Sequence, residues 1–214
     1  MANNPILIAV TGASGALYSL RLIEMLLKSD RSVDLLLSDP ARVVIKQECG
    51  LELQGDGESV VKAVLAFLKL PAIDSLDNIK SKRLQHFALK DWISPVASGS
   101  GGGRDMVICP CSMGTLARVR HGISENLIER GADVTIKEQG RLIMVPRESP
   151  FSPIHLENML ALSRLGVIML PAAPGFYNRP QTVAELIDFI VGRILDRLEI
   201  THDLNPAWPN IAKV

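Results

Sequence analysis

The stretch that decides the fold is Ile6-Leu7-Ile8-Ala9-Val10-Thr11-Gly12-Ala13-Ser14-Gly15, a short apolar run followed by a turn of small residues. Apolar side chains then recur at helical spacing, at Leu17, Leu20, Ile23 and Leu27. The run predicts a buried strand and the spacing predicts a helix behind the turn. Because backbone amides at the start of a helix attract anions, this turn is expected to be able to hold a phosphate.

The same alternation continues along the chain. Further strands are expected at residues 33–37, 85–88, 106–109, 142–145 and 167–170, and further helices at 41–48, 60–70, 124–138, 154–165 and 182–198. Strands that alternate with helices predict an α/β fold, a Rossmann-like, doubly wound, mostly parallel sheet with helices on both faces. The glycine-rich segment 98–103 before one strand fits either a linker or a loop that faces a ligand.

Length and composition limit the class of protein. The 214 residues suit a single domain, 1–214, with a C-terminal tail from about residue 200. Lys plus Arg and Asp plus Glu both number 23, which argues against a general nucleic-acid binder. The first five residues do not resemble a secretory signal, and no apolar run reaches the roughly 18 residues of a membrane span. We therefore expect a cytoplasmic protein without a membrane segment.

Cysteine and histidine give no independent sign of chemistry. Cys49, Cys109 and Cys111 cannot all pair within one chain, and a Cys-x-Cys offers too few ligands for a closed zinc site. Packed free thiols are the preferred interpretation. His155 opens an amphipathic segment, where a buried or capping role is preferred to catalysis. No carboxylate cluster has metal-ligand spacing, so no metal is expected.

Ligands of doubly wound sheets bind beyond the carboxyl ends of the strands. The segments found there are Gly12–Gly15, Ser38, Ser112–Thr115, Arg147 with Glu148, and 171–177. The NAD fingerprint needs glycines at its third and sixth positions, where Ser14 and Leu17 stand, although Asp39 after the second strand leaves that possibility open. Ser112–Thr115 suits either an anion or flavin contact or a simple helix cap.

Seven motifs in one order cover most of the chain, and through them it resembles the UbiX-type flavin prenyltransferases of the flavoprotein decarboxylase-like fold group. They are Thr11-Gly12-Ala13-Ser14-Gly15, Ala97-Ser98-Gly99-Ser100, Cys109-Pro110-Cys111-Ser112, Asn126-Leu127-Ile128-Glu129-Arg130, Val145-Pro146-Arg147-Glu148, His155-Leu156-Glu157-Asn158-Met159 and Pro171-Ala172-Ala173-Pro174-Gly175-Phe176-Tyr177.

The resemblance implies transfer of a dimethylallyl group from dimethylallyl phosphate to reduced FMN, first at N5 and then at C6. The product, prenylated FMN, would serve a UbiD-type decarboxylase, and a homododecamer is implied. Positions that match the family's FMN contacts are Gly12, Ala13, Ser14, Ser38, Ser112, Met113, Gly114, Thr115 and Arg147. Positions that match its prenyl-phosphate site are Ser98, Tyr177, Arg193 and the aromatic Trp208.

The reaction itself asks for cations and a proton donor, because breaking an allylic carbon–oxygen bond develops negative charge on phosphate. Lys137, Arg147 and Arg193 could supply positive charge, and Glu148 the proton. The resemblance adds three catalytic positions: Arg130, and the pair Ser14 and Glu48 for proton handling around N5. Some of these groups are expected to come from neighbouring subunits.

Simpler interpretations stay open for several of these residues. Arg147 and Glu148 could form a surface ion pair, Arg193 could be exposed on the last helix, Glu48 could be a solvated helix-end carboxylate, and Trp208 could pack in the tail. Two other functions are alternatives for this sequence: a flavin-dependent cysteine-type decarboxylase of the same fold group, and a non-catalytic FMN carrier. Segment 171–177 and the lack of histidine before His86 count against the decarboxylase.

Overall fold

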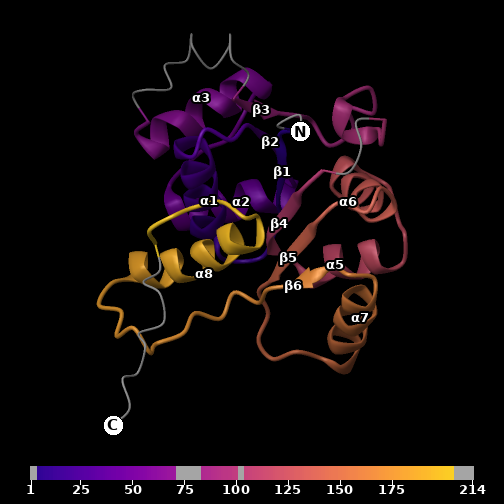
Figure 1. Cartoon of the computed structure of the whole chain (residues 1–214). Coiled ribbons are helices and arrows are strands. Elements are labelled where there is room, and N and C mark those ends of the chain that lie inside the picture. Colours follow the sequence, from indigo (N-terminus) through magenta and orange to yellow (C-terminus); the bar gives the residue numbers. More distant parts are fainter. Residues whose placement is uncertain (1–3, 71–82, 101–103, 205–214) are drawn as a thin grey trace.

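The computed structural model describes residues 4–70, 83–100 and 104–204. Within them lies a six-stranded sheet of order β3-β2-β1-β4-β5-β6 in which every pair is parallel (Figure 1). The strands are β1 (Ile6–Val10), β2 (Val33–Leu37), β3 (Leu84–His86), β4 (Met106–Cys111), β5 (Leu142–Pro146) and β6 (Ile168–Met169). The order reverses between β1 and β4, as in doubly wound nucleotide-binding folds.

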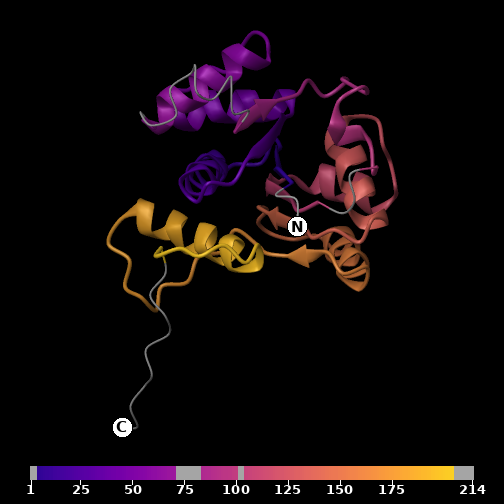
Figure 2. The same cartoon turned by 45° about the horizontal axis from the view of Figure 1, so that its top comes forward.

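Helices cover both faces of this sheet (Figures 1 and 2). On one face lie α1 (Ala16–Lys28), α2 (Asp39–Cys49), α3 (Gly57–Leu68) and α8 (Val183–Arg197). On the other lie the 3-10 turn η1 (Pro95–Ala97), α5 (Met113–Arg120), α6 (Leu127–Lys137) and α7 (Pro153–Arg164). The predicted fold class is therefore confirmed.

The two cores are built from alternate residues of the same strands. In β1, Ile6, Ile8 and Val10 pack toward α1 and α8, whereas Leu7 and Ala9 pack toward α6. All five residues of β1 are buried. Strands with both faces covered must be apolar throughout, which explains the continuous apolar run in the sequence.

Several predicted boundaries need correction. The single helix predicted at 124–138 is only α6, and a separate helix, α5, precedes it. The strand predicted at 106–109 continues to Cys111, so both of its cysteines belong to β4 and not to the loop beyond it. The sequence does contain signals for this break, because Gly122 adopts a positive φ just after α5 and Asn126 caps the start of α6. None of the helices in the described part of the chain is both long and apolar enough to cross a membrane.

Candidate active site

A cavity of about 820 Å³ opens at the carboxyl ends of the strands, beside the point where the strand order reverses. Residues that follow β1, β2 and β4 line it together with the start of α6: Gly12, Ser38, Arg42, Ser112, Gly114, Thr115, Arg118, Asn126 and Glu129. Thr11 joins two of these segments, because its hydroxyl donates to Pro110 O (2.8 Å) and accepts from Ser112 N (2.7 Å). This volume is typical of a small-molecule or cofactor site.

Gly12 allows two of the lining segments to meet. A Cβ placed on Gly12 would lie 2.4 Å from Cβ of Pro40, in the first turn of α2. Pro40 is a rigid ring, so it could make room only if the start of α2 moved. The glycine is therefore required by close approach of the two segments.

We expect Gly12→Ala to destabilise the protein by about 1–3 kcal/mol, the usual cost of overpacking a tight site, and to weaken ligand binding in this cavity by displacing α2. Urea unfolding and fluorescence titration would measure the two effects. A matched control for the loss of stability is Gly114→Ala, where nothing lies within 4 Å of the added Cβ. An equal loss of stability from both substitutions would contradict this explanation.

A carboxylate lies at the N-terminus of α1. The first amides of this helix, at Gly15 and Ala16, donate to the Glu48 carboxylate at 3.0 and 2.8 Å. A carboxylate that reaches across from α2 thus takes up these two amides. Partial burial raises the pKa of Glu48, but hydrogen bonds from Ser14 and from these amides, with the charge of Arg147, outweigh it and hold the pKa below its usual value. Glu48 is therefore an anchored anion and not a free helix-end side chain.

Glu48→Gln should make the protein less stable at pH 7 by about 1 kcal/mol, because a carboxylate at a helix N-terminus is worth roughly that much. The native pKa is depressed, so the stabilisation is fully present above the unfolded value of 4.5 and is lost as pH falls through the native pKa. Urea unfolding at pH 7 and at pH 3.5 should show the gap between the two proteins shrinking. A constant gap would contradict this assignment.

Two other helix N-termini border the cavity. Ser38 caps α2 by accepting from Ala41 N (3.1 Å), and Ser112 caps α5 by accepting from Thr115 N (3.3 Å). The predicted capping role of Ser112 is confirmed. Both helices direct the positive ends of their dipoles toward the cavity, which favours an anionic ligand group there.

A first group of predicted site residues meets beside this cavity. Arg147 Nε donates to Ser14 O at 3.3 Å, and Ser14 in turn hydrogen-bonds to Glu48. Glu148, the next residue after Arg147, is exposed and accepts from Ser149 N at 3.1 Å. Arg147, Ser14 and Glu48 are thus linked at the ends of β1 and β5, and Glu148 is the next residue along the chain. The alternative of an Arg147–Glu148 surface pair is not what the structure shows.

A second group lies on α6 and the neighbouring η1. Arg130 Nε donates to Ala97 O (3.1 Å), next to the exposed Ser98, and pairs with Asp133 at 2.7 Å. Lys137 ends the same helix and pairs with Glu138 at 2.6 Å. Since α6 leads into β5, Lys137 lies toward the amino ends of the strands, away from the cavity.

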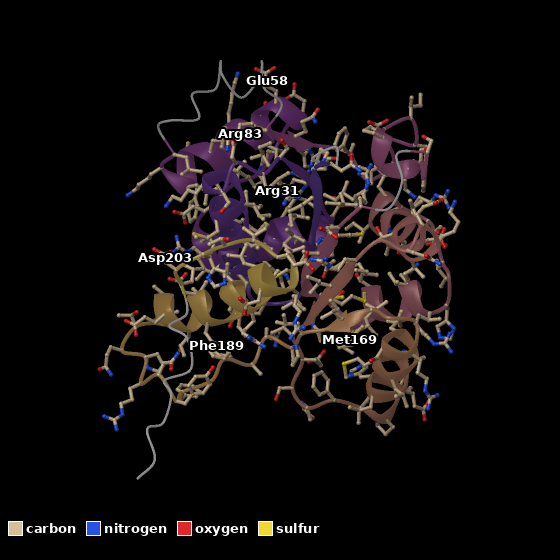
Figure 3. The ribbon with its side chains drawn as sticks, viewed as in Figure 1. Arg31, Glu58, Arg83, Met169, Phe189 and Asp203 are labelled. Carbon is tan, nitrogen blue, oxygen red and sulfur yellow. The ribbon has the colours of Figure 1, made fainter. Side chains whose placement is uncertain are left out.

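A third group lies on α8. Arg193 is exposed and pairs with Asp196 at 3.0 Å. Tyr177 packs edge-on against Phe189 of α8, with ring centroids 5.6 Å apart (Phe189 is labelled in Figure 3). Trp208 lies outside the described residues. Because α6 and α8 cover opposite faces of the sheet, Lys137 and Arg193 of one chain cannot meet at one phosphate.

Sequence reasoning assigned no role to six polar residues of the cavity: Arg42, Lys90, Arg118, Glu125, Asn126 and Glu129. Arg42 stands four residues after Ser38, and Arg118 three after Thr115, so helical spacing could have placed both beside predicted ligand-binding residues.

The histidine and the two cysteines discussed from the sequence have structural roles, as expected. His155 forms a capping box with Ser152. Cys109 and Cys111 are fully buried, and burial raises the pKa of both thiols.

Ala13 and Met113 have buried side chains, so only their backbone can face a ligand. Among residues 4–70, 83–100 and 104–204, no group of three or more His, Cys, Asp or Glu side chains could hold a metal ion.

A doubly wound sheet with a cavity at its switch point, bordered by two capped helix N-termini, defines a protein that binds a phosphorylated, nucleotide-like ligand. The family model described as Flavoprotein matches residues 1–195. The flavin prenyltransferase UbiX of Pseudomonas aeruginosa is 48% identical over 203 residues, covering 95% of this chain and 93% of that protein. UbiX of Methanocaldococcus jannaschii is 39% identical and covers 96% and 99%.

Solved structures agree. A dodecameric FMN-dependent UbiX-like decarboxylase from Escherichia coli O157:H7 aligns with a TM-score of 0.81 at 34% identity, covering 97% of this chain and all of that one. AnUbiX (PadA1) in complex with FMN and dimethylallyl pyrophosphate aligns with a TM-score of 0.81 at 32% identity, covering 97% and 98%. The peptidyl-cysteine decarboxylase EpiD, at 16% identity and a TM-score of 0.55, shares the fold alone. The chain belongs to the UbiX flavin prenyltransferases of the Flavoprotein family, which confirms the resemblance and the enzyme class.

Proposed function

We propose that this chain transfers a dimethylallyl group from dimethylallyl phosphate to N5 and C6 of reduced FMN, making prenylated FMN. The observation that carries this proposal is that one turn, after β1, supplies both Gly12 of the switch-point cavity and Ser14, which contacts Arg147 and Glu48. The relatives named as flavin prenyltransferases support it.

The residues present fit FMN. A cavity of about 820 Å³ has room for a flavin nucleotide, and the capped N-termini of α2 and α5 suit its phosphate. When bound and reduced, FMN supplies the nucleophilic ring atoms. The residues that would hold it are Gly12, Ala13, Ser14, Ser38, Ser112, Met113, Gly114, Thr115 and Arg147.

The chain's own task is to release phosphate from the donor. As the allylic carbon–oxygen bond breaks, its electron pair leaves with the phosphate, and cations lower the energy of that charge. Lys137, Arg130 and Arg193 would supply these cations, with Ser98 and Tyr177 as further phosphate contacts and Trp208 as an aromatic face near the prenyl group. Glu148 would protonate the leaving phosphate. No step in this scheme needs a metal ion.

Ser14 and Glu48 would handle the proton that reduced FMN gives up at its ring nitrogen. The Ser14 hydrogen bond to Glu48 supports this, because it places a hydroxyl that can relay a proton beside an anchored, ionised carboxylate.

The site would be completed by neighbouring subunits. Lys137 and Arg193 lie on opposite faces of the sheet, so a phosphate that contacts both must take them from different chains. The dodecameric relative supports a homododecamer for this chain. We infer further that 1–214 is one flavin-binding domain with a tail from about residue 200, that it acts in the cytoplasm, and that a UbiD-type decarboxylase receives its product.

Phosphate release tests the proposal. Anaerobic incubation with dimethylallyl phosphate should liberate inorganic phosphate in proportion to the reduced FMN supplied, and none with oxidised FMN. Release that is independent of flavin, or no release with either this donor or dimethylallyl pyrophosphate, would contradict the proposal. Activation of an apo UbiD-type decarboxylase by the extracted product tests the recipient.

A further inference from the structure

Among the described residues, two cations that line the cavity have no acidic partner: the exposed Lys90, which donates to the backbone carbonyl oxygen of Glu125 at 2.6 Å, and the part-buried Arg42 of α2. Arg118, its neighbour in the cavity wall, pairs with Glu125 at 2.9 Å and lies 3.8 Å from Glu129. The recorded partners of Arg42 are neutral: the carbonyl oxygen of Leu53 and the imidazole of His86. Its charge is thus left uncompensated at the wall of a cavity, a state that favours an anionic ligand.

His86 holds this guanidinium without cancelling its charge. Arg42 Nη2 lies 3.3 Å from His86 Nε2 at the end of β3. Burial, and then the charge of Arg42, lower the pKa of His86 to about 4. The imidazole is therefore neutral near pH 7, so Nε2 accepts from Arg42 and the proton sits on Nδ1. A guanidinium has five N–H groups, and these two contacts leave others for a ligand.

The place of Arg42 fits a phosphate. It follows the cap Ser38 by one turn of α2, and both residues line the cavity together with Gly114 and Thr115 at the start of α5. The competing anion site, the N-terminus of α1, is filled by Glu48. Two helix N-termini, two hydroxyls and the part-buried guanidinium of Arg42 therefore border the same space, whereas the other unpaired cation, Lys90, is exposed.

We propose that Arg42, held in place by His86 and Leu53, binds the phosphate of the flavin nucleotide and sets the preference for FMN over riboflavin. The proposal rests on the proposed function only in taking FMN as the ligand. His86 acts as a positioning residue, because it contacts the guanidinium and not the phosphate.

Equilibrium titration of oxidised FMN and of riboflavin tests this without turnover. Arg42→Met should weaken FMN binding by about 10-fold or more, as expected for a lost hydrogen bond between charged groups, and leave riboflavin binding unchanged. Arg42→Lys should restore part of the preference, and His86→Leu should reduce it by a smaller factor. The control is Lys46→Met, an exposed residue one turn further along α2 that pairs with Glu52.

Equal weakening of both flavins by Arg42→Met, or no effect on FMN, would overturn the proposal, as would a wild-type protein that binds the two flavins equally. Arg42→Gln, which retains a donor for Leu53 O, checks that any loss is not local unfolding. The outcome is separable from the proposed function. Selective loss of FMN binding in a protein that transfers no prenyl group would support the role of Arg42 and refute the transferase.

Discussion

Glu148→Gln is expected to lower kcat for prenyl transfer by at least about 100-fold, the lower end of what a positioned general acid contributes. Glu148 follows β5 directly after Arg147, whose side chain is fixed on Ser14 O. A glutamine of the same shape cannot deliver a proton to the departing phosphate. Because the FMN cavity is lined by other residues, the Kd for FMN should stay unchanged.

Single-turnover kinetics under anaerobic conditions would measure this loss, and flavin titration would confirm that binding is retained. The exposed Glu157→Gln on α7 is the matched control and should behave as wild type. A Glu148→Gln protein with wild-type kcat would remove the residue from the mechanism. A parallel loss of FMN binding would assign it a structural role instead.

Complementation between subunits is the second large effect expected. Lys137→Met and Arg193→Met should each abolish most activity, because each removes a cation from the leaving phosphate. Co-expressed in one oligomer they should regain activity if, as proposed, each site takes the two residues from different chains, since they lie on opposite faces of the sheet. With random mixing, roughly a quarter of the sites would hold both cations.

The matched control pairs two residues from one helix. Arg130 and Lys137 both lie on α6, so Arg130→Met mixed with Lys137→Met should stay inactive if α6 contributes to a site as a unit. Oligomers that carry two different affinity tags would isolate the mixed species. Failure of Lys137→Met and Arg193→Met to complement each other would contradict a site shared between chains.

Much of the fold could be predicted from the sequence because strands buried on both faces are apolar throughout. The run at β1, the glycines behind it and the helical spacing of α1 together indicated a doubly wound sheet, and the rule that ligands bind at strand ends pointed to Ser38, Ser112 and Arg147. These are local signals, with each residue and its neighbours in one short stretch.

Contacts between distant segments could not be predicted in this way. Glu48 lies 33 residues after Gly15, and nothing in either stretch says that its carboxylate fills the N-terminus of α1. The contact between the Arg42 guanidinium and the His86 imidazole likewise joins residues that are 44 positions apart in the sequence. The separation of Lys137 from Arg193 depends on which face each helix covers, a property of topology that residue types do not encode.

Mass spectrometry of the flavin tests the central claim most directly. The purified protein would be incubated anaerobically with reduced FMN and dimethylallyl phosphate, and the mass of the released flavin would be measured. Prenyl transfer predicts FMN that has gained C5H8, and none of this product with Glu148→Gln in the same time. Bound but unmodified FMN, with dimethylallyl pyrophosphate also failing as donor, would contradict the transferase and favour a flavin-dependent decarboxylase or an FMN carrier.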